Sequence, residues 1–178
     1  RNRPRLYLAM LGAQAIGAQP VPFYEDASAD EIAPLIARLG ITHAIAENQE
    51  QVDKLLLLRA QMPSLAHIVY TSARGLDAYT DAGLLPYERL VEAGRSRLAE
   101  VDAEIARGAP EDVAVLLHTS GTTGEAKVVR LTHAALIHTA SAIARLEGLG
   151  ERDEVLAWLP LAWVKQHITC FAQWLVCG

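Results

Sequence analysis

Cysteine is scarce in this sequence. The 178 residues include two cysteines, Cys170 and Cys177, and both lie in an apolar stretch close to Gly178. Two cysteines cannot build the disulfide framework of a small secreted protein, and their spacing matches no zinc motif. We therefore expect two buried free thiols in a reducing compartment.

An excess of basic residues is also absent. The 16 Lys and Arg residues are outnumbered by 21 Asp and Glu residues, which gives a formal net charge of −5. A nucleic-acid-binding protein usually carries a basic footprint, so we expect no nucleic-acid partner. No apolar run is long enough to cross a bilayer, so we expect no transmembrane segment and, by default, a cytoplasmic location.

A secretory signal peptide is not evident. The apolar stretch from Leu6 to Val21 contains Gln14 and Gln19, and no clear cleavage site follows it. The sequence does not begin with Met and stops abruptly at Gly178. We expect it to be a fragment of a longer chain.

Two common nucleotide-binding motifs are missing. The Walker loop requires a second glycine, followed by a lysine, five residues after its first glycine, but Ala126 occupies the place of that second glycine relative to Gly121. The dinucleotide fingerprint Gly-x-Gly-x-x-Gly occurs nowhere in the chain. Any nucleotide site must therefore use a different loop.

The hydrophobic pattern alternates between helix and strand along the chain. Its periodicity predicts an α/β fold with a largely parallel sheet, and no obvious linker divides the chain. Residues 75–86 are expected to form a loop. The expected helices cover about residues 5–18, 28–39, 48–62, 91–107, 132–146 and 163–176, and the expected strands cover residues 41–46, 66–70, 113–117, 128–131 and 155–159.

Several helix ends carry recognisable capping residues. Ser28 and Glu31 form a capping-box pattern, in which each side chain can bond the other residue's backbone N–H. Gly40 is expected to end that helix. Asn48 and Thr132 are plausible caps of two further helices.

The segment with the clearest chemistry follows the apolar run Val113–Leu117. It reads Thr119-Ser120-Gly121-Thr122-Thr123-Gly124, and Lys127 lies three residues further on. The glycines permit a tight turn whose backbone amides can surround an anion. The hydroxyl groups can donate to phosphate oxygens, and Lys127 adds a mobile positive charge. A solvated turn between strands is the bland alternative, but this ordered string is rare by chance, so phosphate binding is favoured.

The segment from Leu117 to Lys127 resembles the AMP-binding signature of the adenylate-forming superfamily. That superfamily includes acyl-CoA synthetases, luciferases and the adenylation domains of peptide synthetases. Two departures are visible: Ala126 stands where the family usually has Pro, and Val128 where it often has Gly. His118 stands where relatives often carry Tyr. It could line the nucleotide site, but packing within the strand is the favoured interpretation.

Flanking segments resemble long-chain fatty acyl-CoA synthetases. These are residues 17–26, residues 46–54 and the stretch Leu159–Val164, in which Trp163 replaces the usual His. The resemblance implies that residues 1–178 are a fragment of the large N-terminal AMP-binding domain. It also makes Trp163 a candidate residue of the acyl pocket, although simple core packing is an equal alternative.

The implied reaction joins a fatty acid to coenzyme A in two steps at the expense of ATP, with Mg²⁺ on the phosphates. The resemblance assigns Thr119, Ser120, Gly121, Thr122, Thr123, Gly124 and Lys127 to ATP binding. It makes Lys127 the candidate catalytic residue and Thr119 the candidate metal ligand.

Other parts of the family's machinery are missing from this sequence, including a Tyr-Gly-x-Thr-Glu segment and the late lysine. We therefore expect the chain alone not to catalyse turnover. An acyl-AMP ligase that serves a carrier protein and a non-catalytic acyl- or nucleotide-binding module remain alternatives. Peripheral membrane association is compatible with an insoluble substrate, and the acyl chain length and the oligomeric state stay open.

Overall fold

The computed structural model describes residues 2–119 and 126–178, and the chain divides into two compact units. Unit 1 combines the segments Arg1–Tyr24 and Ala99–Gly178, and unit 2 is the intervening segment Glu25–Leu98. The sequence shows no linker at either boundary, so this division was not expected. Unit 1 is built from two segments that lie far apart in the sequence.

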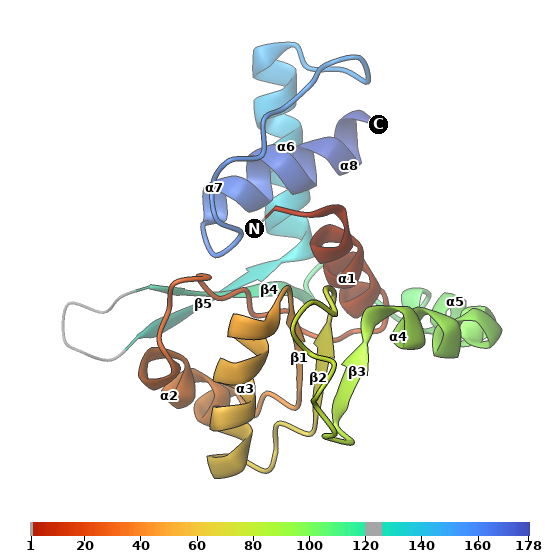
Figure 1. Cartoon of the computed structure of the whole chain (residues 1–178). Helices are drawn as coiled ribbons and strands as arrows, with labels where there is room; N and C mark the ends of the chain where they lie inside the picture. The colour runs from red at the N-terminus through yellow and green to blue at the C-terminus, as the bar shows by residue number, and fades with distance from the viewer. Residues whose placement is uncertain (1, 120–125) are drawn as a thin grey trace. The chain divides into compact units, whose positions relative to one another are not determined.

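Unit 2 contains a three-stranded parallel sheet with the strand order β1-β2-β3 (Figure 1). The strands are β1 (His43–Ala46), β2 (His67–Tyr70) and β3 (Leu84–Pro86). Helix α3 (Gln49–Gln61) forms the crossover from β1 to β2, and α2 (Ala29–Leu39) packs beside α3. The predicted α/β class with a parallel sheet is confirmed.

The predicted caps of unit 2 form as expected. The Ser28 hydroxyl accepts a bond from the Glu31 N–H at 3.3 Å, and the Glu31 carboxylate accepts the Ser28 N–H at 2.7 Å. Gly40 ends α2 in the left-handed conformation, with φ of 61°, which a side chain would make costly. The Asn48 side chain accepts the Gln51 N–H at the start of α3.

The core of unit 2 lies between α3 and the sheet. Val52 and Ile68 are fully buried there, with Ala46 and Leu76 beside them. Burying each aliphatic side chain of this size contributes about 1.5–3 kcal/mol. The prediction of a loop over residues 75–86 was partly wrong, because its last residues pair with β2 as strand β3.

The single helix predicted over residues 91–107 is divided into three short pieces. These are α4 (Tyr87–Gly94), the 3₁₀ turn η1 (Arg95–Arg97) and α5 (Leu98–Ile105). None of their residues is buried, so their apolar side chains do not fix one continuous helix against a core.

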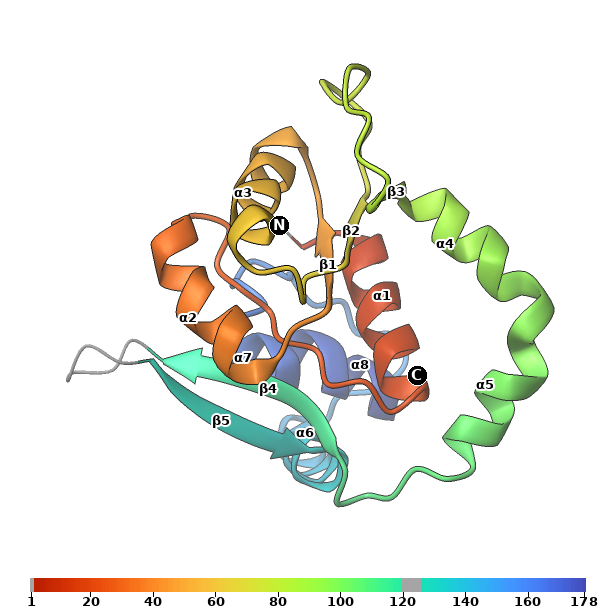
Figure 2. The same cartoon turned by 90° about the horizontal axis from the view of Figure 1, so that it is seen from below.

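Unit 1 is built on an antiparallel hairpin of β4 (Val113–Thr119) and β5 (Lys127–Thr132), which Figure 2 shows side by side. The continuous apolar run in β4 is typical of a parallel strand, and the antiparallel pairing is therefore a correction to that interpretation. Burial explains the pattern, because Ala114 to Leu117 are all buried. Thr132 caps α6 (His133–Glu147) as predicted.

The C-terminal part of the chain departs from the prediction in two places. Residues 155–159 form no strand within the described residues, and Leu156 and Trp158 are 80% and 71% exposed. A strand requires a hydrogen-bonded neighbouring strand. Here the Asn2 side-chain amide donates to the carbonyls of Ala157 and Leu159 instead. The helix predicted over residues 163–176 is present, but it contains a π-helical segment. Its parts are α7 (Val164–Gln166), the π segment η2 (His167–Ala172) and α8 (Gln173–Cys177).

The core of unit 1 joins the hairpin to these helices. Ala114, Val115 and Leu117 of β4 pack against Ala140 of α6 and Ala172 of η2. Helix α1 (Pro4–Ala15) adds a second cluster in which Met10 meets Leu161 and Phe171. None of the helices in the described part of the chain is both long and apolar enough to cross a membrane.

Candidate functional site

The hairpin fixes the two described ends of the predicted phosphate loop. Thr119 is the last residue of β4, Lys127 is the first residue of β5, and the two are paired directly across the antiparallel ladder. Directly opposed residues have side chains on one face of the sheet, with Cβ atoms about 5 Å apart. The predicted residues Ser120, Gly121, Thr122, Thr123 and Gly124 lie outside the described residues.

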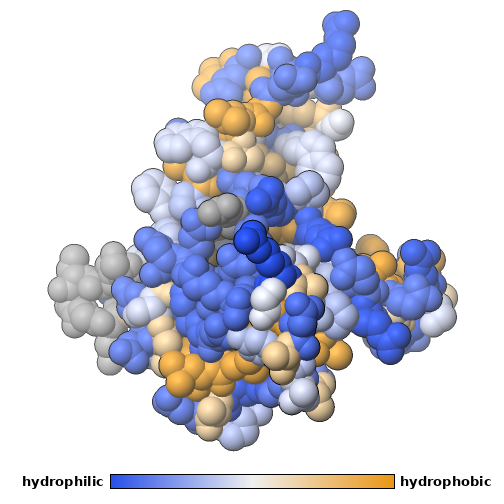
Figure 3. Space-filling view, viewed as in Figure 1, coloured by the Kyte–Doolittle hydropathy of each residue, from blue (hydrophilic) through white to orange (hydrophobic). Residues whose placement is uncertain are grey.

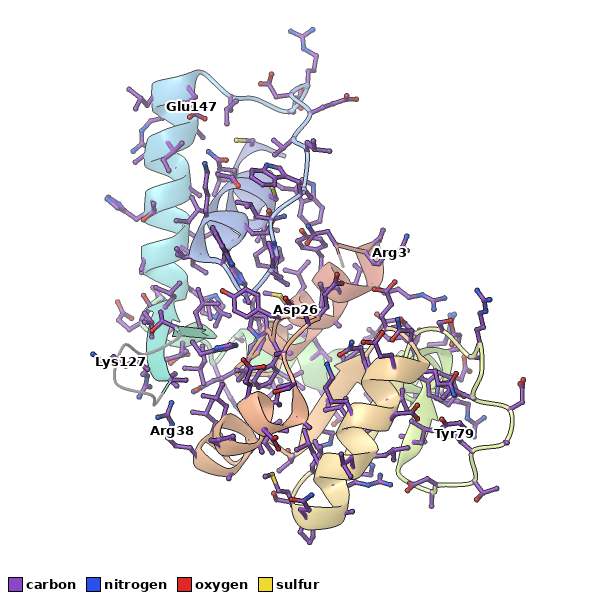
Figure 4. The ribbon with its side chains drawn as sticks, turned by 60° about the vertical axis from the view of Figure 1, so that its left-hand side comes forward. Arg3, Asp26, Arg38, Tyr79, Lys127 and Glu147 are labelled. Atoms are coloured by element: carbon purple, nitrogen blue, oxygen red, sulfur yellow. The ribbon has the colours of Figure 1, made fainter. Side chains whose placement is uncertain are left out.

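Lys127 is available for an anionic ligand. Its side chain is exposed, and it forms no ion pair with any residue in the ranges 2–119 and 126–178. Figure 4 shows Lys127 and Glu147 well separated along unit 1, and Glu147 marks the far end of α6. A hydroxyl and an ammonium on one face of a hairpin can together contact phosphate oxygens.

His118 points to the opposite face from Thr119, because successive residues of a strand alternate. Its ring lies 5.4 Å from the Phe23 ring and 5.6 Å from the Tyr24 ring, measured between centroids. It also forms a hydrogen bond with the backbone of Pro22, where only the carbonyl can accept. Burial lowers the pKa of His118, and the Pro22 bond opposes that shift. His118 is therefore a packed strand residue.

Trp163 precedes the first turn of α7, where its N–H donates to the Pro160 carbonyl at 3.0 Å. It is 49% exposed. It does not line either of two neighbouring cavities of about 270 and 350 Å³ in unit 1. The residues shared by the linings of both cavities are Leu149, Val155, Thr169, Cys170 and Gln173. The role assigned to Trp163 stays a prediction.

Sequence reasoning missed three buried polar side chains on the last helical region. Gln166, His167 and Gln173 are at most 3% exposed, and each has a side-chain atom without a partner among the described residues. Gln166 donates to the Tyr7 hydroxyl at 2.9 Å, while its carbonyl oxygen is unpaired. The stretch includes the π-helical segment η2, an irregularity that occurs often at functional positions. Nothing in the sequence pattern reveals that segment.

The two cysteines are free, as predicted, but they are half-buried instead of fully buried. Cys170 lies against the Leu156 carbonyl, at 3.8 Å from Sγ, and lines both cavities. Neither is part of a group of three or more His, Cys, Asp or Glu residues that could hold an ion, because the described part of the chain contains no such group.

Mg²⁺ fits this part of the chain only with help from a nucleotide. The ion prefers oxygen ligands and usually keeps waters and phosphate oxygens around it. Thr119 offers one exposed hydroxyl, and the described residues place no cluster of carboxylates beside it. The phosphates would therefore supply most of the oxygens.

Comparison with known families settles the class of protein. The family model described as AMP-binding enzyme matches residues 1–178. The chain belongs to this family. A long-chain-fatty-acid–CoA ligase, FadD15 of Mycobacterium bovis, is 31% identical over 153 residues, which are 84% of this chain and 24% of that protein. The rat ligase ACSBG2 is 29% identical over 173 residues, which are 94% of this chain and 26% of that protein. The chain thus spans about a quarter of the length of these curated relatives.

Solved structures support the same fold. MbtA of Mycobacterium smegmatis superposes with a TM-score of 0.68 at 23% identity, over 96% of this chain and 30% of that one. ATP-bound MatB of Rhodopseudomonas palustris gives a TM-score of 0.66 at 16% identity, over 97% of this chain and 32% of that one. The chain is accordingly an AMP-binding family member that is similar in sequence to acyl-CoA ligases.

Proposed function

We propose that the chain is part of an enzyme that activates a fatty acid with ATP and transfers it to coenzyme A, the residues 1–178 being a fragment of the N-terminal AMP-binding domain. The observation that carries the proposal is the family match over the whole chain, combined with the register that puts Lys127 opposite Thr119. Two curated relatives named as long-chain-fatty-acid–CoA ligases favour a fatty acid as the substrate.

Each predicted loop residue has a specific role in this proposal. The amides and hydroxyls of residues 119–124 hold the phosphates of ATP, and Lys127 neutralises negative charge as pyrophosphate leaves. The substrate carboxylate attacks the α-phosphorus and forms an acyl-adenylate. The coenzyme A thiol then displaces AMP from the acyl carbonyl. Bound Mg²⁺ would neutralise phosphate charge, with Thr119 as its candidate protein ligand.

The location is part of the same proposal. The half-buried free thiols of Cys170 and Cys177 favour a reducing compartment such as the cytoplasm. Contact with a membrane surface would bring an insoluble fatty acid to the enzyme, and no nucleic acid takes part.

The decisive test is fatty-acid-dependent exchange of labelled pyrophosphate into ATP by the full-length parent protein. Exchange with acids of graded length is expected, and the length profile identifies the substrate. A change of that profile in Trp163→Ala would support its assignment to the acyl pocket. Folded protein that shows no exchange with any fatty acid would overturn the proposal. Acyl transfer to a carrier protein, without any to coenzyme A, would favour an acyl-AMP ligase.

Lys127→Met tests the role of the loop. Loss of one charge-assisted phosphate contact is expected to reduce exchange roughly tenfold to a hundredfold. Arg130→Met is the matched control, because Arg130 is an exposed cation on the same strand that faces the other side of the hairpin. Equal losses in both variants would show that general charge, and not a specific contact at Lys127, supports activity.

A further inference from the structure

Two histidines of unit 2 lie directly beside each other at the amino ends of neighbouring strands. His43 begins β1, His67 begins β2, and the parallel register pairs the two residues. Both side chains are exposed, and their ring centroids are 5.0 Å apart with the planes tilted by 38°. Neither residue belongs to the predicted phosphate loop.

We propose that His43 and His67 form a two-imidazole site for a divalent transition metal such as Zn²⁺ or Ni²⁺. Imidazole nitrogen is a preferred ligand of these ions and a poor one for Mg²⁺. The proposed ion differs in its ligand chemistry from the Mg²⁺ expected with ATP, and the proposal does not depend on the proposed function of the chain.

The ring separation matches the geometry of such a chelate. A zinc–nitrogen bond of about 2.0–2.1 Å puts each ring centre roughly 3.2 Å from the metal. Two such rings at a tetrahedral angle have centres about 5.2 Å apart. The observed separation of 5.0 Å lies close to that value. The strand register therefore already holds the two rings at the separation that such a chelate requires.

Thr42 supports the site in two ways. Its carbonyl accepts the N–H groups of Ala66 and His67, at 2.9 and 3.3 Å, which ties the starts of the two strands together. Its hydroxyl lies 2.8 Å from Nδ1 of His43. When Nδ1–H donates to that hydroxyl, Nε2 presents its lone pair to a metal. An outer hydrogen bond that fixes the tautomer in this way is a regular feature of metal-binding histidines.

The surroundings set the expected strength of the site. Among the residues that the structure describes, no third His, Cys, Asp or Glu completes a cluster around the pair. Water would then fill the remaining coordination positions, as in an open site. We expect one ion to bind with moderate affinity and to hold β1 against β2 at their amino ends.

The test is direct titration of the 178-residue chain with Zn²⁺ and with Ni²⁺, using a competing fluorescent chelator. Cys170→Ser and Cys177→Ser are included in every protein, because thiols also bind these ions. One equivalent is expected to bind. Substitution of either histidine, His43→Asn or His67→Asn, should weaken binding roughly a hundredfold, since the second arm of a chelate acts at a high effective concentration.

Two further variants separate the site from general histidine binding. Thr42→Val keeps the backbone carbonyl but removes the hydroxyl, and it should weaken binding about tenfold. His138→Asn removes an exposed histidine of α6 and should leave the affinity unchanged. Circular dichroism checks that each variant is folded. Unchanged affinity in both His43→Asn and His67→Asn would overturn the proposal. So would the lack of saturable binding by the chain that carries only the two cysteine substitutions.

Discussion

His167 should make the stability of unit 1 depend on pH. The side chain is fully buried in η2, where one ring nitrogen, Nε2, lies 2.5 Å from the Leu161 carbonyl and the other, Nδ1, has no partner among the described residues. Burial disfavours the charged ring and lowers the pKa of His167 from 6.5 to about 4, although the Leu161 bond opposes this shift. The neutral imidazole is therefore the form that fits the fold.

The sign of the effect follows from proton binding in the two states. Between pH 6.5 and about pH 4 the unfolded chain binds a proton at this residue and the folded chain does not. Acidification therefore favours unfolding, and the loss of stability begins below about pH 6.5 and is complete near pH 4. At 1.36 kcal/mol per pH unit, the interval corresponds to about 3 kcal/mol.

The variant His167→Gln removes the titration and keeps an amide N–H that can reach the Leu161 carbonyl. Urea unfolding at several pH values between 7 and 4 measures the effect. Far-UV circular dichroism is a better probe of unfolding than tryptophan fluorescence. All three tryptophans are already about half exposed or more in the folded chain, so their fluorescence should change little on unfolding. Between pH 7 and pH 4, the free energy of unfolding of the unsubstituted chain should fall by about 3 kcal/mol more than that of His167→Gln. His138→Gln, which removes an exposed histidine, should keep the steep decline. Identical pH profiles for the parent and His167→Gln would refute the reasoning.

Two further changes test the packing and capping of unit 2. Gly83→Ala would place a Cβ atom 2.6 Å from the Ala66 carbonyl oxygen, so β3 must shift away from β2, and about 1–3 kcal/mol of stability should be lost in urea unfolding. Gly12→Ala is the control, because a Cβ atom there meets nothing within 4 Å. This substitution should stabilise α1 by about 1 kcal/mol. A loss of stability in both variants would contradict the steric argument. Ser28→Ala removes the cap of α2 and should cost about 1 kcal/mol by the same assay, whereas no loss would show that the capping box contributes little.

The parts of the fold that the sequence predicts well depend on local chemistry. Ser28, Asn48 and Thr132 cap helices because a short polar side chain can reach an N–H a few residues away, whatever the rest of the chain does. The parallel sheet of unit 2 was likewise predicted from the alternation of strands and helices. These features need no knowledge of distant residues.

The failures concern contacts between distant residues. The stretch 155–159 has the composition of a strand, but a strand also needs a neighbour, and no pattern within the segment reports whether one is present. The short strand β3 shows the opposite error. Its residues were expected to form a loop, but they pair with β2 and form a strand. The pairing of His43 with His67 was missed for the same reason, since it depends on the register between two strands.

For the candidate site, the residue types were predictable and the geometry was not. The string from Thr119 to Gly124 indicates phosphate binding by its hydroxyls and glycines, but the position of Lys127 opposite Thr119 follows from the antiparallel hairpin. That hairpin was expected to be part of a parallel sheet. The sequence thus supplies the hydroxyl and the positive charge, and the pairing of β4 with β5 places them opposite each other.

The unpaired polar atoms around η2 differ in whether their side chains can titrate. Oε1 of Gln166, Nε2 of Gln173 and Nδ1 of His167 are all buried without a partner among the described residues. An amide takes up no proton between pH 7 and pH 4, whereas an imidazole can. An unsatisfied buried group costs about 1–3 kcal/mol, and protonation would add a buried charge to that cost. The pH dependence should therefore come from His167, while the two glutamines remain neutral hydrogen-bonding groups at every pH of the titration.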